Sequence, residues 1–323
     1  MKWFITLVLM VATCGSARAA EFLEGSVTST LDGQSQPIRY FLPPNSTTPQ
    51  PLLVLLHTWS GGYDQANYLQ MLVEECAQRN WALVAPHFRG PNNRPEAGAS
   101  DLAVRDVMDA VAWMKMQTSI DANRIYLTGA SGGGHMSLIL AGRHPDVWAG
   151  VSAWVPITDL AAWHAESVAK GQNYAKNIEA LCGGVPGASD VVDEQYRLRS
   201  PLTHLPRAKG LAIDIQAGIH DGHTGSVPVS HSLRAFNLLA TLNEQPGQAL
   251  TAEQIASITA TQTLPEALPS APADASDEGR QHAILLRRAA GPVRLTLFEG
   301  GHEGDLKTAV RWLETQRRAT VTP

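Results

Sequence analysis

The 323-residue chain is 44% hydrophobic and 17% charged, a balance that suits one sizeable globular domain. Its 25 basic and 30 acidic side chains give a formal net charge of −5 at pH 7, which argues against nucleic acid as a partner. The apolar run near the amino terminus is too short to span a membrane comfortably, and the sequence has no second candidate.

The first residues have the pattern of an export signal. Lys2 precedes an apolar run over residues 3–13, and Ala17-Arg-Ala19 is a small-x-small cleavage pattern. We therefore predict a signal peptide over 1–19 and a mature protein, from 20 to 323, that is periplasmic or extracellular. Lipid anchoring at Cys14 is disfavoured because Thr13 is a poor match to the small residue expected before a lipidated cysteine.

Two cysteines, Cys76 and Cys182, remain in the mature chain. An exported protein permits a disulfide between them, but two cysteines do not require one. The sequence leaves their pairing open, as it does the oligomeric state.

The mature chain begins with two predicted antiparallel strands, at 21–30 and 36–42, separated by the turn signal Asp32-Gly33. Buried strands and amphipathic helices then alternate. The strands are expected at 51–57, 81–86, 125–127, 148–154, 211–217 and 293–298, and the apolar faces of the helices begin at Leu69, Val104, Met136, Leu233 and Leu306. This order predicts an α/β fold with a mostly parallel central sheet flanked by helices on both faces.

Two insertions interrupt the alternation. We expect residues 157–206 to cover the pocket as a cap. Residues 244–288 begin with a capping-box pattern at Thr251–Gln254 and continue into a stretch rich in Pro, Ala, Ser and Asp, which predicts a short extra helix and a loop.

The strand at 125–127 and the helical stripe from Met136 enclose the sequence Gly129-Ala-Ser131-Gly-Gly133, which must turn sharply from strand into helix. Glycines allow strand and helix to approach closely, and the strained serine presents its hydroxyl as a nucleophile. The alternative is a glycine-rich connection with a capping serine.

An acid and a base follow two later strands. Asp221 comes after the strand at 211–217, and His302 comes after the strand at 293–298. Both loops lie at carboxyl ends of parallel strands, so we expect them to meet Ser131 at one edge of the sheet. His302 would take and return the hydroxyl proton, and Asp221 would orient the imidazole and stabilise its charged form.

The backbone amides of Trp59 and Gly132 are the candidate oxyanion hole. Gly132 begins the helix after the strand-to-helix turn around Ser131, here called the elbow, and Trp59 follows the first central strand. The Trp59 side chain can also cover the edge of the core, because only its main chain is needed for this role.

The motifs together resemble an α/β-hydrolase, and within that class the catalytic domain of the prolyl oligopeptidase type. The resemblance rests on the elbow at 124–134, on Gly218-Ile-His-Asp221 and on Gly301-His302, and it covers residue 52 to the C-terminus. It implies the α/β-hydrolase fold, a Ser-His-Asp triad and hydrolysis through an acyl-enzyme that needs no cofactor.

The chain departs from that family in three ways. His57-Thr58 replaces the usual His-Gly, and Val227-Pro228 follows the acid only after extra residues that include His223. The chain also has no room for the propeller that restricts the peptidase members to small peptides. This last departure favours an esterase over an oligopeptidase, with a small peptidase or aminopeptidase as the alternative.

Four residues are candidates for substrate binding: Arg89, Arg94, Trp154 and His223. The two arginines can hold a carboxylate, or they can make ion pairs that stabilise their loop. Trp154 and Trp163 can stack on sugars. These features favour an exported esterase acting on a small or oligosaccharide ester, carrying an acetyl or methyl-uronate group.

Two further possibilities stay open. His220, Asp221 and His223 can be proposed as metal ligands, although they lie on a loop and follow no established ligand spacing. A non-catalytic binding protein on the same scaffold would normally lack a member of the triad, and none is missing here.

Overall fold

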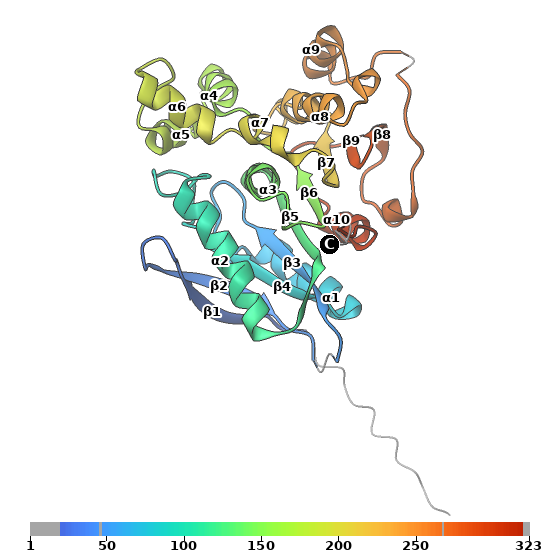
Figure 1. Ribbon diagram of the computed structural model, residues 1–323. Helices are drawn as coiled ribbons and strands as arrows, with labels where there is room; N and C mark the ends of the chain where they lie inside the picture. Colours follow the sequence, from blue (N-terminus) through green and yellow to red (C-terminus); the bar gives the residue numbers. More distant parts are fainter. Residues whose placement is uncertain (1–19, 45–46, 267, 319–323) are drawn as a thin grey trace, which may run out of the picture.

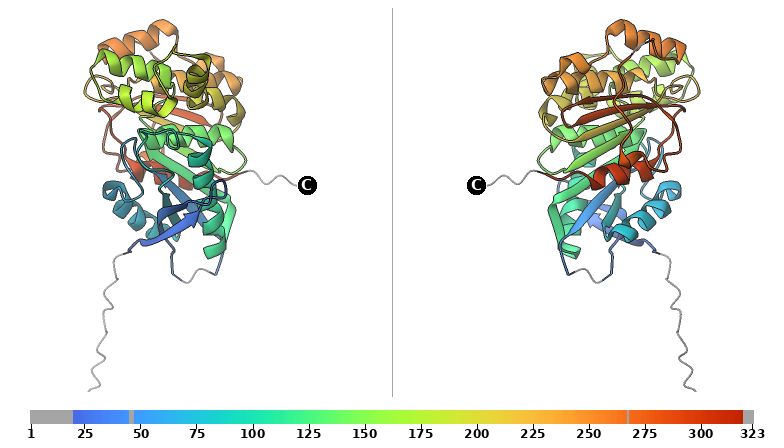
Figure 2. Two further views of the ribbon diagram at one scale, coloured as in Figure 1. Left: turned by 90° about the vertical axis from the view of Figure 1, so that its left-hand side faces the viewer. Right: turned by 90° about the vertical axis from the view of Figure 1, so that its right-hand side faces the viewer.

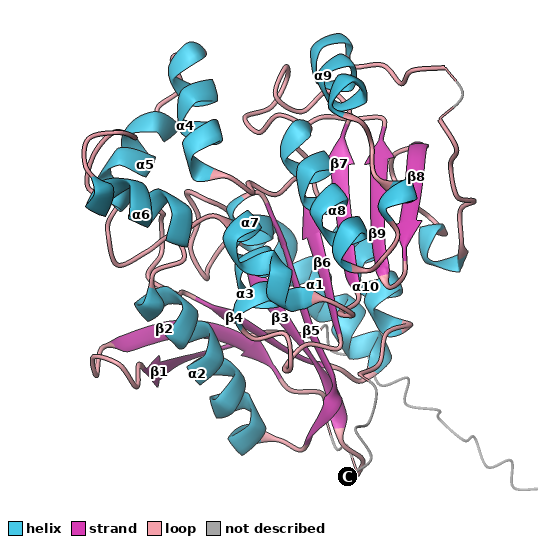
Figure 3. Ribbon diagram, turned by 45° about the horizontal axis from the view of Figure 1, so that its top comes forward, coloured by secondary structure: helices cyan, strands magenta, loops and turns pink. Residues whose placement is uncertain are grey.

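The computed structural model describes residues 20–44, 47–266 and 268–318, and within them a nine-stranded sheet runs through the molecule (Figures 1 and 3). In spatial order the strands are β1 (Leu23–Thr28), β2 (Ser35–Phe41), β4 (Ala82–Pro86), β3 (Gln50–Leu56), β5 (Ile120–Ala130), β6 (Gly150–Trp154), β7 (Ile213–Gly218), β9 (Val293–Phe298) and β8 (Ile284–Ala290). The central strands, which run from β4 through β3, β5, β6 and β7 to β9, are parallel to one another. Strands β1, β2 and β8 are antiparallel to their neighbours. The predicted mostly parallel sheet is confirmed.

Helices cover both faces of the sheet because its central strands are apolar on both sides. In β3, Leu52, Val54 and Leu56 belong to one apolar cluster, and Leu53 and Leu55 belong to the other. The first cluster contains side chains of α2 (Asp101–Gln117), α3 (Gly132–Arg143) and α8 (Ser230–Leu242), and the second contains those of α1 (Ala66–Arg79) and α10 (Leu306–Glu314). Burial of one leucine side chain stabilises the fold by about 1.5–3 kcal/mol.

Strand β8 was not predicted from the sequence, which placed residues 284–288 in a loop. Arg287 and Arg288 interrupt the apolar pattern of this segment. In the fold the Arg287 guanidinium is buried and paired with Asp277 at 2.5 Å, so the charges are tolerated inside an edge strand.

The first insertion consists of α4 (Leu160–Ala169), α5 (Tyr174–Cys182), α6 (Asp190–Leu198) and α7 (Pro201–His204), followed by a 3₁₀ turn. Its apolar side chains form a third cluster with Trp59 and Ala97 from the main domain. The side views in Figure 2 show these yellow-green helices and the orange helix of the second insertion at the same end of the molecule.

The helix predicted in the second insertion is α9 (Ala252–Thr261). Its capping box is present as predicted: the Thr251 hydroxyl accepts from the Gln254 amide, and the Gln254 side chain accepts from the Thr251 amide. Asp277 and Asp274 anchor the loop that follows, through ion pairs with Arg287 and Arg294.

Cys76 and Cys182 are free thiols buried in separate apolar clusters, so no disulfide joins them. Burial raises the pKa of both thiols, to about 12 for Cys182. The predicted signal peptide, including Cys14, lies outside the described residues. Over 20–44, 47–266 and 268–318, no helix combines the length and apolarity needed to cross a bilayer.

Candidate active site

The elbow between β5 and α3 has the strained geometry that the sequence predicts. Ser131 has φ 59° and ψ −118°, and its amide donates to the Trp154 carbonyl at 2.9 Å. A Cβ at Gly129 would lie 2.7 Å from the carbonyl carbon of Gly133, and a Cβ at Gly133 would lie 2.3 Å from the Leu56 oxygen. Neither position accommodates a side chain, which explains the two glycines that flank the serine.

The three predicted polar residues meet above the carboxyl ends of β5, β7 and β9. The Ser131 Oγ lies 2.8 Å from His302 Nε2, and His302 Nδ1 lies 2.6 Å from Asp221 Oδ2. Because a carboxylate only accepts, the Nδ1 proton points to Asp221, and Nε2 is left to accept the serine proton.

Asp221 is held as a buried carboxylate. It is 2% exposed, and its Oδ1 accepts from the amides of Gly222 at 2.8 Å and Val227 at 3.1 Å. Val227 therefore supports the acid although extra residues separate the two in sequence. Gly225 also faces the pair: a Cβ there would lie 2.3 Å from Asp221 Oδ1 and 2.5 Å from His302 Cβ.

The amides of Trp59 and Gly132 lie together beside the serine. A Cβ at Gly132 would lie 2.3 Å from the Trp59 nitrogen. Gly132 is the first residue of α3, where an amide has no acceptor within the helix. Within the described part of the chain, the Trp59 amide donates to no other group. Both N–H groups remain for a ligand oxygen.

The loop that carries Trp59 is fixed by the side chain of Gln65, a role that was not predicted from the sequence. The Gln65 amide group accepts from the Thr58 amide and donates to the Thr58 hydroxyl, both at 3.0 Å. The threonine that replaces the usual glycine thus takes part in a local cross-link. A polar residue seven positions after Thr58, just before α1, was the available signal.

His57 supports the same loop and does not act as a second base. Its ring nitrogens lie 2.9 Å from the Thr58 carbonyl and 2.8 Å from the His87 carbonyl, and the ring stacks on Phe88 at 3.8 Å. Burial lowers the pKa of His57 from 6.5 to about 4, so the ring is neutral at pH 7.

A small cavity of about 180 Å³ opens above the serine. Tyr68 of α1 and Tyr174 of α5 contribute to its walls. Tyr68 was not predicted from the sequence, whereas Tyr174 lies in the segment that was predicted to cap the pocket. Its lining residues are Thr58, Trp59, Ser60, Tyr68, Ala130, Ser131, Val155, Tyr174 and His302. Burial raises the pKa of Tyr68, which keeps its hydroxyl protonated as a hydrogen-bond donor.

Residues 68–254, more than half of the chain, match the prolyl oligopeptidase family. The chain belongs to this family. Its fold is shared with solved structures of both peptidases and esterases.

Individual relatives are distant. The uncharacterized peptidase YtmA of Bacillus subtilis is 24% identical over 161 residues, which cover 49% of this chain and 58% of YtmA. Acylaminoacyl peptidase of Pyrococcus horikoshii superposes with a TM-score of 0.55 at 16% identity, over 70% of this chain and 36% of that enzyme. The serine hydrolase FphF of Staphylococcus aureus gives a TM-score of 0.60 at 14% identity, over 91% of this chain and 98% of FphF. The chain thus spans only part of the length of the two peptidases, and the structural likenesses show the fold.

In this prolyl oligopeptidase family member, Arg89 does not fit the predicted role of binding a substrate carboxylate. Its buried guanidinium already pairs with Asp106 at 2.5 Å and with Asp32 at 2.7 Å. The alternative, a loop-stabilising ion pair, is what the structure shows. Arg94 is exposed and donates to the Arg89 carbonyl at 2.6 Å.

Neither tryptophan is available to stack on a sugar, because both side chains are fully buried. Trp154 donates to the Ser152 hydroxyl beneath the sheet edge, and Trp163 packs edge-on against Trp59. His223 does not line the catalytic cavity; its Nε2 lies 2.7 Å from the Thr259 carbonyl of α9. The extra residues before Val227 therefore contact the second insertion.

The residues considered as metal ligands point to different partners. His220 places one ring nitrogen 3.0 Å from Gln262 and the other 2.5 Å from Glu299, and the hydrogen bond to Glu299 raises the pKa of the ring. Asp221 faces His302, and His223 faces α9. In the described part of the chain, no three His, Cys, Asp or Glu side chains are arranged to hold a metal ion.

Proposed function

We propose that this protein hydrolyses short carboxylic esters on substituted carbohydrates, either acetyl esters or methyl esters of uronates. The observation that carries the proposal is the serine–imidazole–carboxylate chain of hydrogen bonds that opens into a cavity of only about 180 Å³. Pockets for drug-sized ligands usually measure roughly 300–1,000 Å³. The space beside Ser131 therefore suits a short acyl or alkoxy group.

In the proposed mechanism, Ser131 Oγ attacks the ester carbonyl while His302 Nε2 takes its proton. The amides of Trp59 and Gly132 donate to the oxygen that becomes negative, and each such donor typically contributes about 10²–10³ in rate. His302 returns the proton to the leaving alcohol, which leaves an acyl group on Ser131. Water, deprotonated by the same imidazole, then releases the acid, while Asp221 stabilises the charged ring.

A small peptidase is the second candidate, because the family is named for peptidases and the relatives include an acylaminoacyl peptidase. The cavity supports the esterase, because about 180 Å³ beside Ser131 leaves room for a short group rather than for a peptide. The solved structures that share the fold also include a thermostable esterase, with a TM-score of 0.51 at 18% identity over 92% of this chain and 63% of that enzyme.

Export belongs to the same proposal and rests on the pattern of residues 1–19. Fractionation of expressing cells, followed by amino-terminal sequencing of the recovered protein, tests it. A mature chain that begins near Ala20 in the periplasm or medium supports export, and an intact Met1 in the cytoplasm contradicts it.

Comparison of acetylated sugars, methyl uronates and aminoacyl-proline amides tests the reaction. We expect ester turnover to exceed amide turnover, and Ser131→Ala to abolish both turnover and labelling by a serine-directed phosphonate. Activity should persist in chelator. Amide turnover well above ester turnover would instead establish the peptidase.

A further inference from the structure

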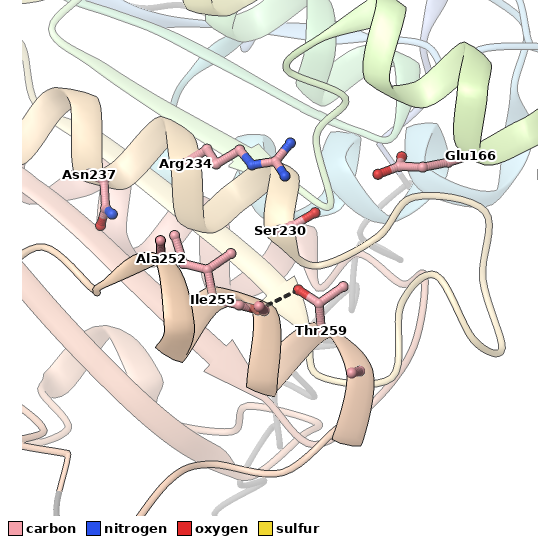
Figure 4. Close-up of a pocket in the computed structure, with 9 residues that line it drawn as sticks. Glu166, Ser230, Arg234, Asn237, Ala252, Ile255 and Thr259 are labelled. Carbon is pink, nitrogen blue, oxygen red and sulfur yellow. Dashed lines mark hydrogen bonds between the residues drawn. The ribbon is translucent and has the colours of Figure 1, made fainter.

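A second and larger pocket, with a volume of about 480 Å³, lies between α8, α9 and α4 (Figure 4). It shares no lining residue with the catalytic cavity. One wall is apolar and is formed by Ala252, Ile255, Ala256 and Ala260 of α9. Polar side chains of α8 and α4 form the opposite side.

The apolar wall is held in place at both ends of α9. At its start, the Asn237 side chain of α8 donates to the Leu250 carbonyl at 2.6 Å and accepts from the Leu250 amide at 2.8 Å. Near its end, His223 contacts the Thr259 carbonyl. Because these contacts involve backbone groups of the α9 segment, the pocket is formed before any ligand arrives.

Two polar groups of α8 in the pocket have no partner within 20–44, 47–266 and 268–318. Ser230 is only 3% exposed, yet its hydroxyl makes no hydrogen bond with the described residues. One turn further along the helix, Arg234 is an exposed residue at the pocket, and its guanidinium makes neither a hydrogen bond nor an ion pair with them. The Ser230 hydroxyl oxygen is not among the fully buried polar atoms, so it is accessible from the pocket. The pair therefore offers donors to a ligand.

Glu166 of α4 faces Arg234 across the pocket without forming an ion pair with it (Figure 4). Its Oε2 instead accepts from His231 Nε2 at 2.9 Å, and His231 Nδ1 accepts from the Thr158 amide at 3.1 Å. This chain of hydrogen bonds fixes the carboxylate, which leaves the space between the two charges for a ligand.

We infer that this pocket binds a uronic acid residue of an oligosaccharide. The sugar carboxylate would pair with Arg234 and accept from Ser230, as guanidinium groups pair with carboxylates elsewhere. Its hydroxyl groups would donate to Glu166, and the apolar face of its ring would lie on Ile255 and the alanines of α9. An acid without hydroxyl groups would leave Glu166 facing an apolar surface.

Helix α4 connects the pocket to the catalytic site, because it carries both Glu166 and Trp163. Trp163, three residues before Glu166 on α4, packs against Trp59 and donates to the Ser226 carbonyl at 2.8 Å. The inference goes beyond the proposed function, since binding of the sugar acid requires no reaction at Ser131.

The test is calorimetric titration of the Ser131→Ala protein with trigalacturonate, with neutral galactotriose and with cinnamate, an acid that has no hydroxyl group. We expect trigalacturonate to bind more tightly than the other two ligands. Removal of a hydrogen-bonded charged partner should weaken binding about tenfold or more, so we expect that effect from Arg234→Ala. Ala256→Phe, which fills the pocket from an exposed position, should do the same.

Arg105→Ala, at an exposed arginine of α2, is the matched control and should leave binding unchanged. Circular dichroism confirms that each variant is folded. No binding, equal binding of the neutral sugar, tighter binding of cinnamate, or indifference to both pocket substitutions would overturn the inference. Because the ester panel is measured separately on the wild-type protein, either proposal can fail without the other.

Discussion

Gly225→Ala places one methyl group against the acid–base pair of the candidate site. The new Cβ would lie 2.3 Å from Asp221 Oδ1 and 2.5 Å from His302 Cβ, where ordinary contacts measure 3.4–4 Å. Gly225 is not among the residues with positive φ, so alanine fits the backbone, and the effect is steric. The carboxylate and the imidazole must therefore move apart by about 1 Å.

A misplacement of about 1 Å can cost roughly a hundredfold in rate. We therefore expect kcat for a short ester such as 4-nitrophenyl acetate to fall about 100-fold, equivalent to about 2.7 kcal/mol of transition-state stabilisation. The KM should change little, because the methyl group lies behind the histidine and not among the residues that line the cavity. Steady-state kinetics of purified protein measure both constants.

Gly247→Ala is the matched control, since a Cβ at that position meets nothing within 4 Å and the residue has no positive φ. It should retain wild-type kcat. If Gly225→Ala retains kcat within about threefold, or if it loses activity only because it unfolds at the assay temperature, the reasoning about the Asp221–His302 contact is refuted.

Other predictions concern stability, its dependence on pH, and the loop that carries Trp59. Arg89→Ala should lower the free energy of unfolding by about 3–5 kcal/mol, because it leaves a buried carboxylate unpaired. Denaturant unfolding measures this loss, and a selective loss of activity toward acidic esters with unchanged stability would restore the substrate-binding role. Burial lowers the pKa of His57 and of His135 from 6.5 to about 4, so the unfolded chain binds more protons between these values. Stability should then fall as pH drops from 6.5 to 4, by at most about 3 kcal/mol per histidine; His135→Gln should reduce this slope, and an unfolding free energy that is constant from pH 7 to 5 would contradict it. Gln65→Ala should lower kcat about tenfold with KM unchanged, since two hydrogen bonds to Thr58 are lost; a change confined to KM would assign Gln65 to substrate binding instead.

Local sequence patterns predicted most of the fold because they are consequences of periodicity and chain stereochemistry. The alternation of buried strands and amphipathic helices required a parallel sheet covered on both faces, and the described elements follow that order. The capping box at Thr251 was readable for the same reason, since its two hydrogen bonds join residues three apart.

Predictions failed where a residue's role depends on a distant partner. Strand β8 was missed because Arg287 looks unsuited to a buried strand until Asp277 is seen to neutralise it. Arg89 looked free to bind substrate because nothing local reveals that Asp32, 57 residues earlier, occupies its guanidinium. Trp154 was read as a sugar platform although the fold buries it completely.

The sequence by itself determined that Ser131, Asp221 and His302 follow three strands, and parallel strands bring their carboxyl ends to one edge of a sheet. Only the tertiary structure decided what surrounds them: the Gln65 cross-link, the two tyrosines of the cavity, and the separate pocket between α8 and α9. The physical reason is that strand order follows from local hydrophobic periodicity. The size of a cavity, and whether a charged side chain has an ion-pair partner, depend instead on side chains that come together only when the insertions pack against the sheet.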